Sequence, residues 1–301
     1  MWISDQWKDY EIMDAGDGAR LERWGTVILS RPDPQVLWPK TLSEKEWEKA
    51  DGVYVRSSKG GGEWTRHGMP DAWQISYGAL FFHIRPFSFK HTGIFPEQAA
   101  NWDAMSSIIK EANRPVKVLN LFAYTGGATC ALLHAGAHVT HVDASKGMVQ
   151  VAKENAALSG LAERPVRWLV DDCARFVARE LRRGNRYDAI LLDPPSYGRG
   201  PNGEVWKIED AIYPLLADCA RLLSDTPLFF FLNMYTTGLQ PGTLSFLVQR
   251  AFMEAGLLPD PSGKQESVSG KVRILSEELG LPVTSPGLIL PCGACCRVIF
   301  G

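Results

Sequence analysis

The sequence predicts an α/β fold: a mostly parallel sheet with a small β-rich domain in front of it. From about residue 116 onward, short apolar runs alternate with segments of helical periodicity. This pattern is typical of a parallel sheet covered by helices on both faces. Before residue 86, strand-like runs are instead separated by turns rich in glycine and proline. We therefore expect an N-terminal domain over residues 1–85 and a larger domain over residues 86–301.

The N-terminal domain is rich in tryptophan and nearly balanced in charge. It holds seven of the ten tryptophans, and residues 1–100 carry 12 Lys+Arg against 14 Asp+Glu. This balance favours an aromatic core over a nucleic-acid-binding face. Strands are expected over 26–30, 52–56 and 79–85, a hairpin connection at 60–62, and one helix over 41–50 with Ser43 as its cap.

The larger domain follows a strand–helix alternation that ends in an antiparallel hairpin. A bridge over residues 86–115 contains a helix that begins at Pro96, since proline is favoured at the first helical position. Strands are expected over 116–121, 138–143, 166–171, 187–193 and 227–234, helices over 127–135, 145–159, 173–183, 205–223 and 242–256, and late strands near 265–275 and 288–300.

Composition points to a cytoplasmic protein. The chain has 301 residues, 45% of them hydrophobic, and a net charge of -2, so it exerts no global attraction on nucleic acid or anionic lipid. It has no apolar run long enough to span a bilayer and no N-terminal signal peptide. Six cysteines fit reduced thiols. Cys292, Cys295 and Cys296 lack a second ligand pair at zinc spacing, so we expect no metal and no membrane partner.

The first expected strand of the larger domain ends in a Gly-Gly turn that leads into a helix. Such a strand–turn–helix brings backbone N–H groups and a helix N-terminus towards a ligand. A side chain at either glycine would hold that ligand away from the backbone. The predicted cofactor-binding residues of this loop are Phe122, Ala123, Tyr124, Thr125, Gly126 and Gly127.

Acidic residues follow the next three expected strands. Ligands of open parallel sheets bind at the carboxyl ends of the strands, where a carboxylate can accept both hydroxyls of a ribose. The alternatives are a helix cap at Asp143 and solvated turn residues at Asp171 and Asp172. The residues are Asp143 with Ala144 and Ser145 (Ser145 also being the expected cap of the next helix), then Asp171 and Asp172, then Asp193 with Pro194 and Tyr197.

A nicotinamide dehydrogenase is the main competitor on grounds of fold. Its G-x-G-x-x-G loop brings a pyrophosphate close to three glycines. The corresponding stretch, Ala123–Ala128, does not fit that pattern. A nucleoside cofactor without phosphate is therefore favoured.

Together these motifs resemble those of class I S-adenosylmethionine-dependent methyltransferases, most closely the bacterial group that includes large-subunit ribosomal RNA methyltransferases. Residues 90–102 also resemble that group's segment before the sheet. The resemblance implies a Rossmann-like sheet, S-adenosylmethionine as cofactor and ribosomal RNA as substrate. It further implies that Thr92, Phe95 and Gln98 close over the cofactor, that Asp143 binds ribose and Asp172 adenine, and that Asp193 and Pro194 lie near the methyl group.

The Asp193–Tyr197 run is similar to the Asp/Asn-Pro-Pro-Tyr loop of enzymes that methylate exocyclic amino groups. There the acidic group and a backbone carbonyl accept hydrogen bonds from the amine, while the aromatic ring stacks on the base. We expect Asp193, Pro194 and Tyr197 to be the catalytic residues. Carbon methylation of cytosine needs a thiolate, and Ser196 occupies one of the two positions where related enzymes carry it. Cys292 stays a candidate for approaching the site.

The substrate is left open by the residues themselves. Arg175, Arg179 and Arg183 form a ridge on one helix side, which is either a nucleic-acid contact or a solvated face near a helix C-terminus. Three hypotheses follow. The chain is an RNA base methyltransferase, a methyltransferase acting on a protein or small molecule, or a cofactor-binding protein without catalysis.

Overall fold

The computed structural model describes residues 1–57, 61–87, 90–259 and 271–301. The chain divides into two compact units. The larger unit comprises Met1, Asn101–Leu279 and Cys292–Gly301, and the smaller unit comprises Trp2–Ala100 and Gly280–Pro291. The division therefore falls after Ala100 rather than after residue 85, and the smaller unit also includes the central part of the late hairpin.

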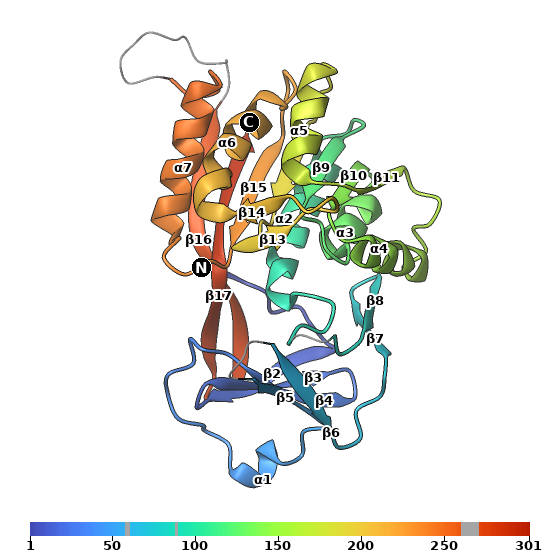
Figure 1. The fold of residues 1–301 in the computed structure, drawn as a ribbon, viewed down its shortest axis with the longest axis vertical. Coiled ribbons are helices and arrows are strands. Elements are labelled where there is room, and N and C mark those ends of the chain that lie inside the picture. Colours follow the sequence, from blue (N-terminus) through green and yellow to red (C-terminus); the bar gives the residue numbers. More distant parts are fainter. Residues whose placement is uncertain (58–60, 88–89, 260–270) are drawn as a thin grey trace. The chain divides into compact units, whose positions relative to one another are not determined.

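The larger unit is built on a mostly parallel sheet, which confirms the predicted fold class (Figure 1). The strand order is β11-β10-β9-β12-β15, all parallel, followed by the antiparallel strand β17 and then β16. These strands are β9 (Lys117–Leu121), β10 (His138–Asp143), β11 (Val166–Val170), β12 (Ala189–Leu192), β15 (Phe229–Met234), β16 (Val272–Ser285) and β17 (Leu288–Phe300).

Helices cover the sheet in two groups. The connections from β9 to β10 and β11 run towards one edge, whereas β12 and β15 lie on the other side of β9. Right-handed crossovers place the helices of these two directions on opposite faces of the sheet. The helices are α2 (Ala99–Glu111), α3 (Gly127–His134), α4 (Lys146–Leu158), α5 (Cys173–Arg182), α6 (Ile208–Arg221) and α7 (Pro241–Glu254).

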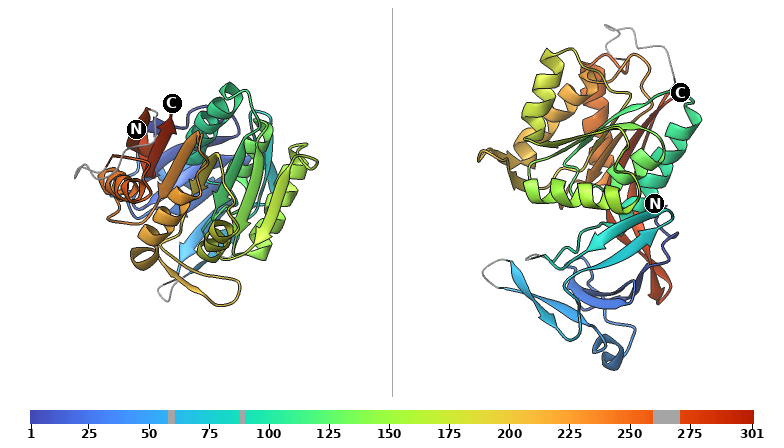
Figure 2. Two further views of the ribbon diagram at one scale, coloured as in Figure 1. Left: turned by 90° about the horizontal axis from the view of Figure 1, so that it is seen from above. Right: turned by 90° about the vertical axis from the view of Figure 1, so that its right-hand side faces the viewer.

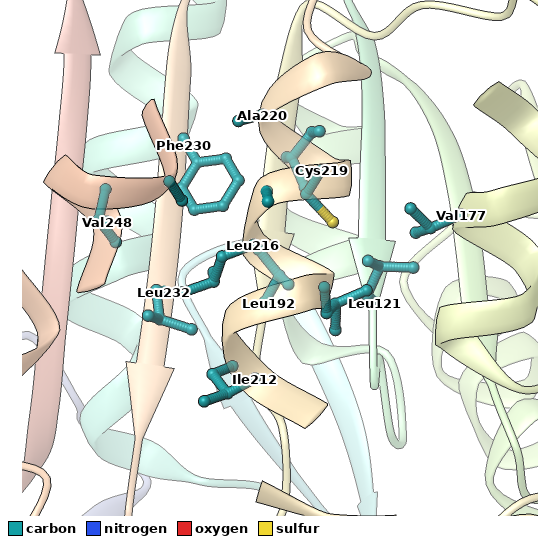
Figure 3. Packing of buried hydrophobic residues seen from close by; sticks show 14 of the residues in the cluster. Leu121, Val177, Leu192, Ile212, Leu216, Cys219, Ala220, Phe230, Leu232 and Val248 are labelled. Atoms are coloured by element: carbon teal, nitrogen blue, oxygen red, sulfur yellow. The ribbon is translucent and has the colours of Figure 1, made fainter. Parts of the chain in front are cut away.

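A continuous apolar core lies between the sheet and α5, α6 and α7. Every residue of β12 and β15 is buried, as expected for central strands covered on both faces. Figure 3 shows how side chains from three helices meet those of the strands. Its labelled members are Leu121, Val177, Leu192, Ile212, Leu216, Cys219, Ala220, Phe230, Leu232 and Val248.

Two predictions in the larger unit are wrong. Residues 205–207 form a strand rather than the start of a helix, because the Gly-Pro-Asn-Gly run at 200–203 turns the chain back into a hairpin. That hairpin consists of β13 (Tyr197–Arg199) and β14 (Val205–Lys207). The late strand predicted near 265–275 lies partly outside the described residues, and β16 continues to Ser285 through two adjacent glutamates and a buried Leu-Gly-Leu run.

The smaller unit is a β structure with strand order β16-β2-β3-β4-β5-β6 and a separate β7–β8 hairpin. The predicted hairpin connection at 60–62 lies partly outside the described residues. Ser43 precedes the helix as expected, but its hydroxyl makes no capping bond, which corrects that prediction. The elements are β1 (Trp2–Ile3), β2 (Tyr10–Gly16), β3 (Ala19–Trp24), β4 (Val27–Pro32), α1 (Glu44–Trp47), β5 (Gly52–Arg56), β6 (Gly62–Arg66), β7 (Trp73–Tyr77), β8 (Leu80–Ile84) and η1 (Pro96–Gln98).

A buried ion pair stabilises the interior of the smaller unit. The Arg31 guanidinium donates to both carboxylate oxygens of Glu22, at 2.5 and 2.7 Å, and the Tyr10 hydroxyl donates to Glu22 at 2.7 Å. Because Arg31 favours the charged form, the pKa of Glu22 falls to about 2 despite burial, which acts in the opposite direction. Among the described helices, none is both long and apolar enough to cross a membrane.

Candidate active site at the carboxyl edge of the parallel sheet

The carboxyl ends of five parallel strands meet at one edge of the larger unit's sheet. The strand order changes direction between β9 and β12, which are hydrogen-bonded neighbours. In open α/β sheets this switch point is where ligands bind. The loops after β9, β10, β11 and β12 hold all predicted site residues except Thr92, Phe95 and Gln98.

The loop after β9 has an unusual backbone conformation. Phe122, Tyr124 and Gly126 all adopt positive φ angles, of 55°, 49° and 80°. For a residue with a side chain, this left-handed conformation costs about 1–2 kcal/mol. Two aromatic residues in that conformation indicate that neighbouring groups hold the loop in place.

Acceptors at the end of β10 and the start of α5 supply this restraint. The Phe122 N–H donates to the Cys173 sulfur at 3.3 Å, the Ala123 N–H to the Val142 carbonyl at 3.1 Å, and the Tyr124 N–H to Asp143 Oδ2 at 2.8 Å. Asn155 on α4 donates to the Thr125 carbonyl at 2.9 Å. Three successive N–H groups and one carbonyl of the turn are thus bonded to neighbouring elements.

The structure gives Gly126 a packing role that the sequence did not predict. A Cβ at this position would lie 2.8 Å from the Cβ of Ala152 on α4, and its φ is left-handed. Glycine therefore permits both the left-handed backbone of the turn and the close packing of α4 against it. Gly127 is buried as the first residue of α3.

The Asp143 carboxylate stands at the end of β10. Its Oδ2 accepts the Tyr124 N–H and its Oδ1 accepts the Ser145 N–H, both at 2.8 Å. Burial raises the pKa of Asp143, and these two backbone donors partly offset that effect. A carboxylate offers about four lone-pair sites, so each oxygen keeps capacity for a further donor such as a ribose hydroxyl. Ser145 caps α4 by accepting the Met148 N–H, as predicted, and Ala144 lies between the two.

The two aspartates after β11 already have partners within the protein. Asp172 caps α5, its Oδ1 accepting the Arg175 N–H at 2.8 Å. Asp171 forms an ion pair with Arg179. Both aspartates thus make contacts within the protein. An adenine contact by either one stays a prediction.

The loop after β12 carries the predicted catalytic residues. Asp193 is half-buried, and its N–H donates to the Leu121 carbonyl at 3.3 Å, which links this loop to the end of β9. The carbonyls of Pro195 and Ser196 accept hydrogen bonds from Trp206 Nε1 and the Ile208 N–H. Among the described residues, none donates to the carbonyl of the buried Pro194.

The sequence did not reveal the role of Trp206. Its indole N–H donates to the Pro195 carbonyl at 2.6 Å, and its ring packs on Phe122 with centroids 4.9 Å apart. One side chain thus contacts both the loop after β9 and the loop after β12. The turn residues at 200–203 were the available signal, since they indicate a hairpin that brings Trp206 back to Pro195.

The basic ridge on α5 is paired internally. Arg175 contacts Glu204 at 2.5 Å, Arg179 contacts Asp171, and Arg183 contacts Glu180 at 3.1 Å. Each of the three cations thus has an acidic partner. This favours the solvated-face interpretation over a nucleic-acid contact.

Thr92, Phe95 and Gln98 belong to the smaller unit. Thr92 is buried and its carbonyl accepts the Arg85 N–H at 3.0 Å. The Phe95 ring lies 5.1 Å from that of His91, and the Phe95 carbonyl accepts the Gln98 N–H at 3.1 Å. Their closure over a cofactor stays a prediction.

The fold and the edge define a class of protein: an α/β unit for a nucleoside cofactor without phosphate, with a carboxylate at the end of the second strand. The particular family follows from comparison. The family model of the S-adenosylmethionine-dependent methyltransferases matches residues 53–210. The chain belongs to this family, and S-adenosylmethionine is its cofactor.

Individual relatives agree with this family. The ribosomal RNA large subunit methyltransferase K/L of Shewanella frigidimarina is 30% identical over 70% of this chain and 28% of that protein. Its counterpart in Methylococcus capsulatus is 31% identical over 65% of this chain and 25% of that protein. The chain thus spans about a quarter of the length of these curated relatives.

Solved structures match almost the whole chain. The crystal structure of an S-adenosylmethionine-dependent methyltransferase from Agrobacterium tumefaciens is 35% identical, with a TM-score of 0.88 over 99% of this chain and 93% of that chain. A Streptococcus mutans protein described as a methyltransferase is 16% identical, with a TM-score of 0.69 over 98% and 76% of the two chains. The second match shows the fold alone.

The residues at the edge suit the cofactor. The open lone pairs on Asp143 match the two hydroxyls of a ribose, and the restrained loop from Phe122 to Gly127 presents backbone where the rest of the ligand would lie. S-adenosylmethionine carries its methyl group on a sulfonium and contains no phosphate, so the loop does not need the third glycine of a pyrophosphate-binding motif.

Replacing Asp143 with alanine is expected to weaken S-adenosylmethionine binding at least about a hundredfold, because two hydrogen bonds to a charged acceptor are lost. Affinity of the wild type should also fall on acidification at a higher pH than for an ordinary aspartate, since burial raises the pKa of Asp143. Calorimetric titration with the cofactor measures both effects.

The matched control for Asp143→Ala is Cys173→Ala. It removes the acceptor of the Phe122 N–H and leaves the carboxylate in place. We expect a much smaller loss of affinity than for Asp143→Ala. Equal affinity of Asp143→Ala and wild type would remove this residue from the cofactor site.

Trp206→Phe tests the link between the two loops. The substitution keeps an aromatic ring against Phe122 but deletes the hydrogen bond to Pro195, so we expect cofactor affinity within about twofold of wild type and faster amide exchange across residues 196–207. Hydrogen-exchange mass spectrometry provides the measurement. Trp168→Phe, on β11, is the control and should leave that exchange unchanged. Unaltered exchange in Trp206→Phe would refute the link.

Proposed function

We propose that this chain transfers the methyl group of S-adenosylmethionine directly to a base of large-subunit ribosomal RNA. Membership of the methyltransferase family supports the reaction. The names of the Shewanella and Methylococcus relatives support the substrate class. Because bacterial ribosomal RNA is made and assembled into ribosomes in the cytoplasm, the proposal includes a cytoplasmic location for this chain.

The observation that carries the proposal is the loop after β12. Asp193 begins it with its N–H bonded to the end of β9, no described residue donates a hydrogen bond to the Pro194 carbonyl, and Tyr197 is 54% exposed at the far end of the loop. An exocyclic amine needs acceptors for its hydrogens, which the Asp193 carboxylate and Pro194 carbonyl offer. An exposed ring beside them offers a stacking surface worth about 1–3 kcal/mol.

The protein contributes to this reaction by aligning the acceptor nitrogen with the methyl group. When bound, the cofactor supplies an electrophilic methyl group on a sulfonium. Asp193 and the Pro194 carbonyl orient the acceptor nitrogen, and Tyr197 holds the base plane. Orientation of this kind supplies roughly 7–11 kcal/mol of barrier reduction in well-aligned reactions.

The described cysteines support direct transfer over thiolate catalysis. Burial raises the pKa of Cys130 and Cys295 to about 12 and that of Cys296 to about 11. It also raises the thiol pKa of Cys173 and Cys219 well above the ordinary value. A thiol with such a pKa is not a nucleophile near neutral pH. Only Cys292, half-buried on β17, differs in burial from these five.

A labelled-methyl assay tests the proposed substrate. Ribosomal RNA from a strain that lacks this chain should accept label from wild type, whereas Asp193→Ala should transfer about a hundredfold more slowly with unchanged cofactor affinity. Label that enters only protein or small molecules would support the alternative methyltransferase substrates. Cofactor binding without any transfer would support a non-catalytic protein.

Cys292→Ser tests the mechanism. Cys292 lies two residues before Ala294, which pairs with Met234 at the end of β15, and it is the one cysteine of the six that is not fully buried. Direct transfer predicts a rate within about twofold of wild type, since hydroxyl and thiol are close in size and neither reacts. A complete loss of transfer in the folded variant would contradict direct transfer.

A further inference from the structure

The β13–β14 hairpin projects from the larger unit directly after the catalytic loop (Figure 2). Side chains on a two-stranded ribbon alternate between its faces. Trp206 is buried on the inner face, where it contacts Pro195 and Phe122. The outer face is left to solvent and has no part in the contacts that stabilise the site.

The outer face combines an aromatic ring with two cations. Tyr197 pairs with Lys207 and Arg199 pairs with Val205 across the hairpin. Tyr197 and Val205 are 54% and 56% exposed. Directly paired residues on such a ribbon have Cβ atoms about 5 Å apart, and diagonal ones about 7–8 Å. The four side chains therefore form one small surface, which we call the outer hairpin face.

The two cations on this face carry uncompensated charge. Neither Arg199 nor Lys207 forms an ion pair with any residue in the described part of the chain. The acidic residue within the hairpin, Glu204, is engaged by Arg175 and by the Asn202 N–H. Glu209 and Asp210 follow Lys207 in the first turn of α6, where carboxylates are stabilised by the helix N-terminus.

We propose that the outer hairpin face binds the single-stranded RNA around the target base, with Tyr197 stacking on that base and Arg199 and Lys207 contacting phosphates of the adjoining nucleotides. This inference rests on the proposed function and adds a binding surface to it. Exposed aromatics between unpaired cations are suited to unpaired nucleotides, because bases stack on the ring while phosphates neutralise the charge. A protein partner would gain little from two isolated cations beside so small an apolar area.

The anchoring of the hairpin explains how such binding would assist the reaction. The Trp206 hydrogen bond fixes the inner face to Pro195, one residue beyond Pro194. The Ser196 hydroxyl is also bonded to the Thr236 hydroxyl at 2.6 Å, which ties the same loop to the chain after β15. RNA bound to the outer hairpin face is therefore held at a fixed position relative to the Asp193 carboxylate and the Pro194 carbonyl.

The salt dependence of RNA binding tests this surface. Each phosphate contact to a single strand contributes about 0.7 to the slope of log affinity against log salt. We expect Arg199→Gln/Lys207→Gln to lower that slope by about 1.4, measured by fluorescence anisotropy with a labelled mixed-sequence single-stranded RNA over a range of KCl concentrations. Tyr197→Ala should weaken binding about tenfold or more at every salt concentration and leave the slope unchanged.

Lys110→Gln/Lys153→Gln is the charge-matched control. Both lysines are exposed, on α2 and α4, and their loss should leave the slope as in wild type. An unchanged slope in Arg199→Gln/Lys207→Gln, from a wild type that labels ribosomal RNA, would overturn this surface and leave the proposed function standing. A wild type that labels no RNA but labels protein would overturn the proposed function itself, and this inference with it.

Discussion

The bond between the Asp143 carboxylate and the Tyr124 N–H is the constraint on which the site depends. It joins the loop after β9 to the end of β10, while the other carboxylate oxygen holds the start of α4 through Ser145. Phe122 and Tyr124 have left-handed backbones, so without neighbouring acceptors the loop would relax to a more favourable conformation. The same carboxylate that orders the loop is the group suited to a ribose. The order of the loop and the predicted recognition of the ligand therefore depend on one side chain.

Most of the larger unit could be predicted from the sequence because its central strands are short, apolar and buried on both faces. Residues 138–143 form a strand with the predicted bounds, and Ser145 caps the helix that follows. The hairpin at 197–207 was missed because its strands are three residues long and one of them precedes a helical pattern without a break. β16 was cut short because its glutamates, glycine and proline are unfavourable for strands, although the strand buries Leu279, Gly280 and Leu281.

The sequence placed most of the predicted site residues at the carboxyl ends of the parallel strands, where the structure has them, but it could not assign the contacts of individual residues. An aspartate after a strand fits a helix cap, an ion pair and a ligand contact equally well, and the structure contains the first two in Asp172 and Asp171. The glycine turn was visible as a motif, whereas the contact that requires Gly126 is with Ala152, far along the chain. Such roles depend on which distant residue packs against the motif, and no local pattern records that.

Phe122 shows how strain and packing are balanced at the switch point. A glycine there would remove the cost of the left-handed backbone, but it would also remove the ring that meets Trp206 at 4.9 Å. Burying such a ring contributes about as much as, or more than, the backbone strain costs. The indole in turn holds the Pro195 carbonyl. The loop after β9 and the loop after β12 are thus held together by the same pair of rings.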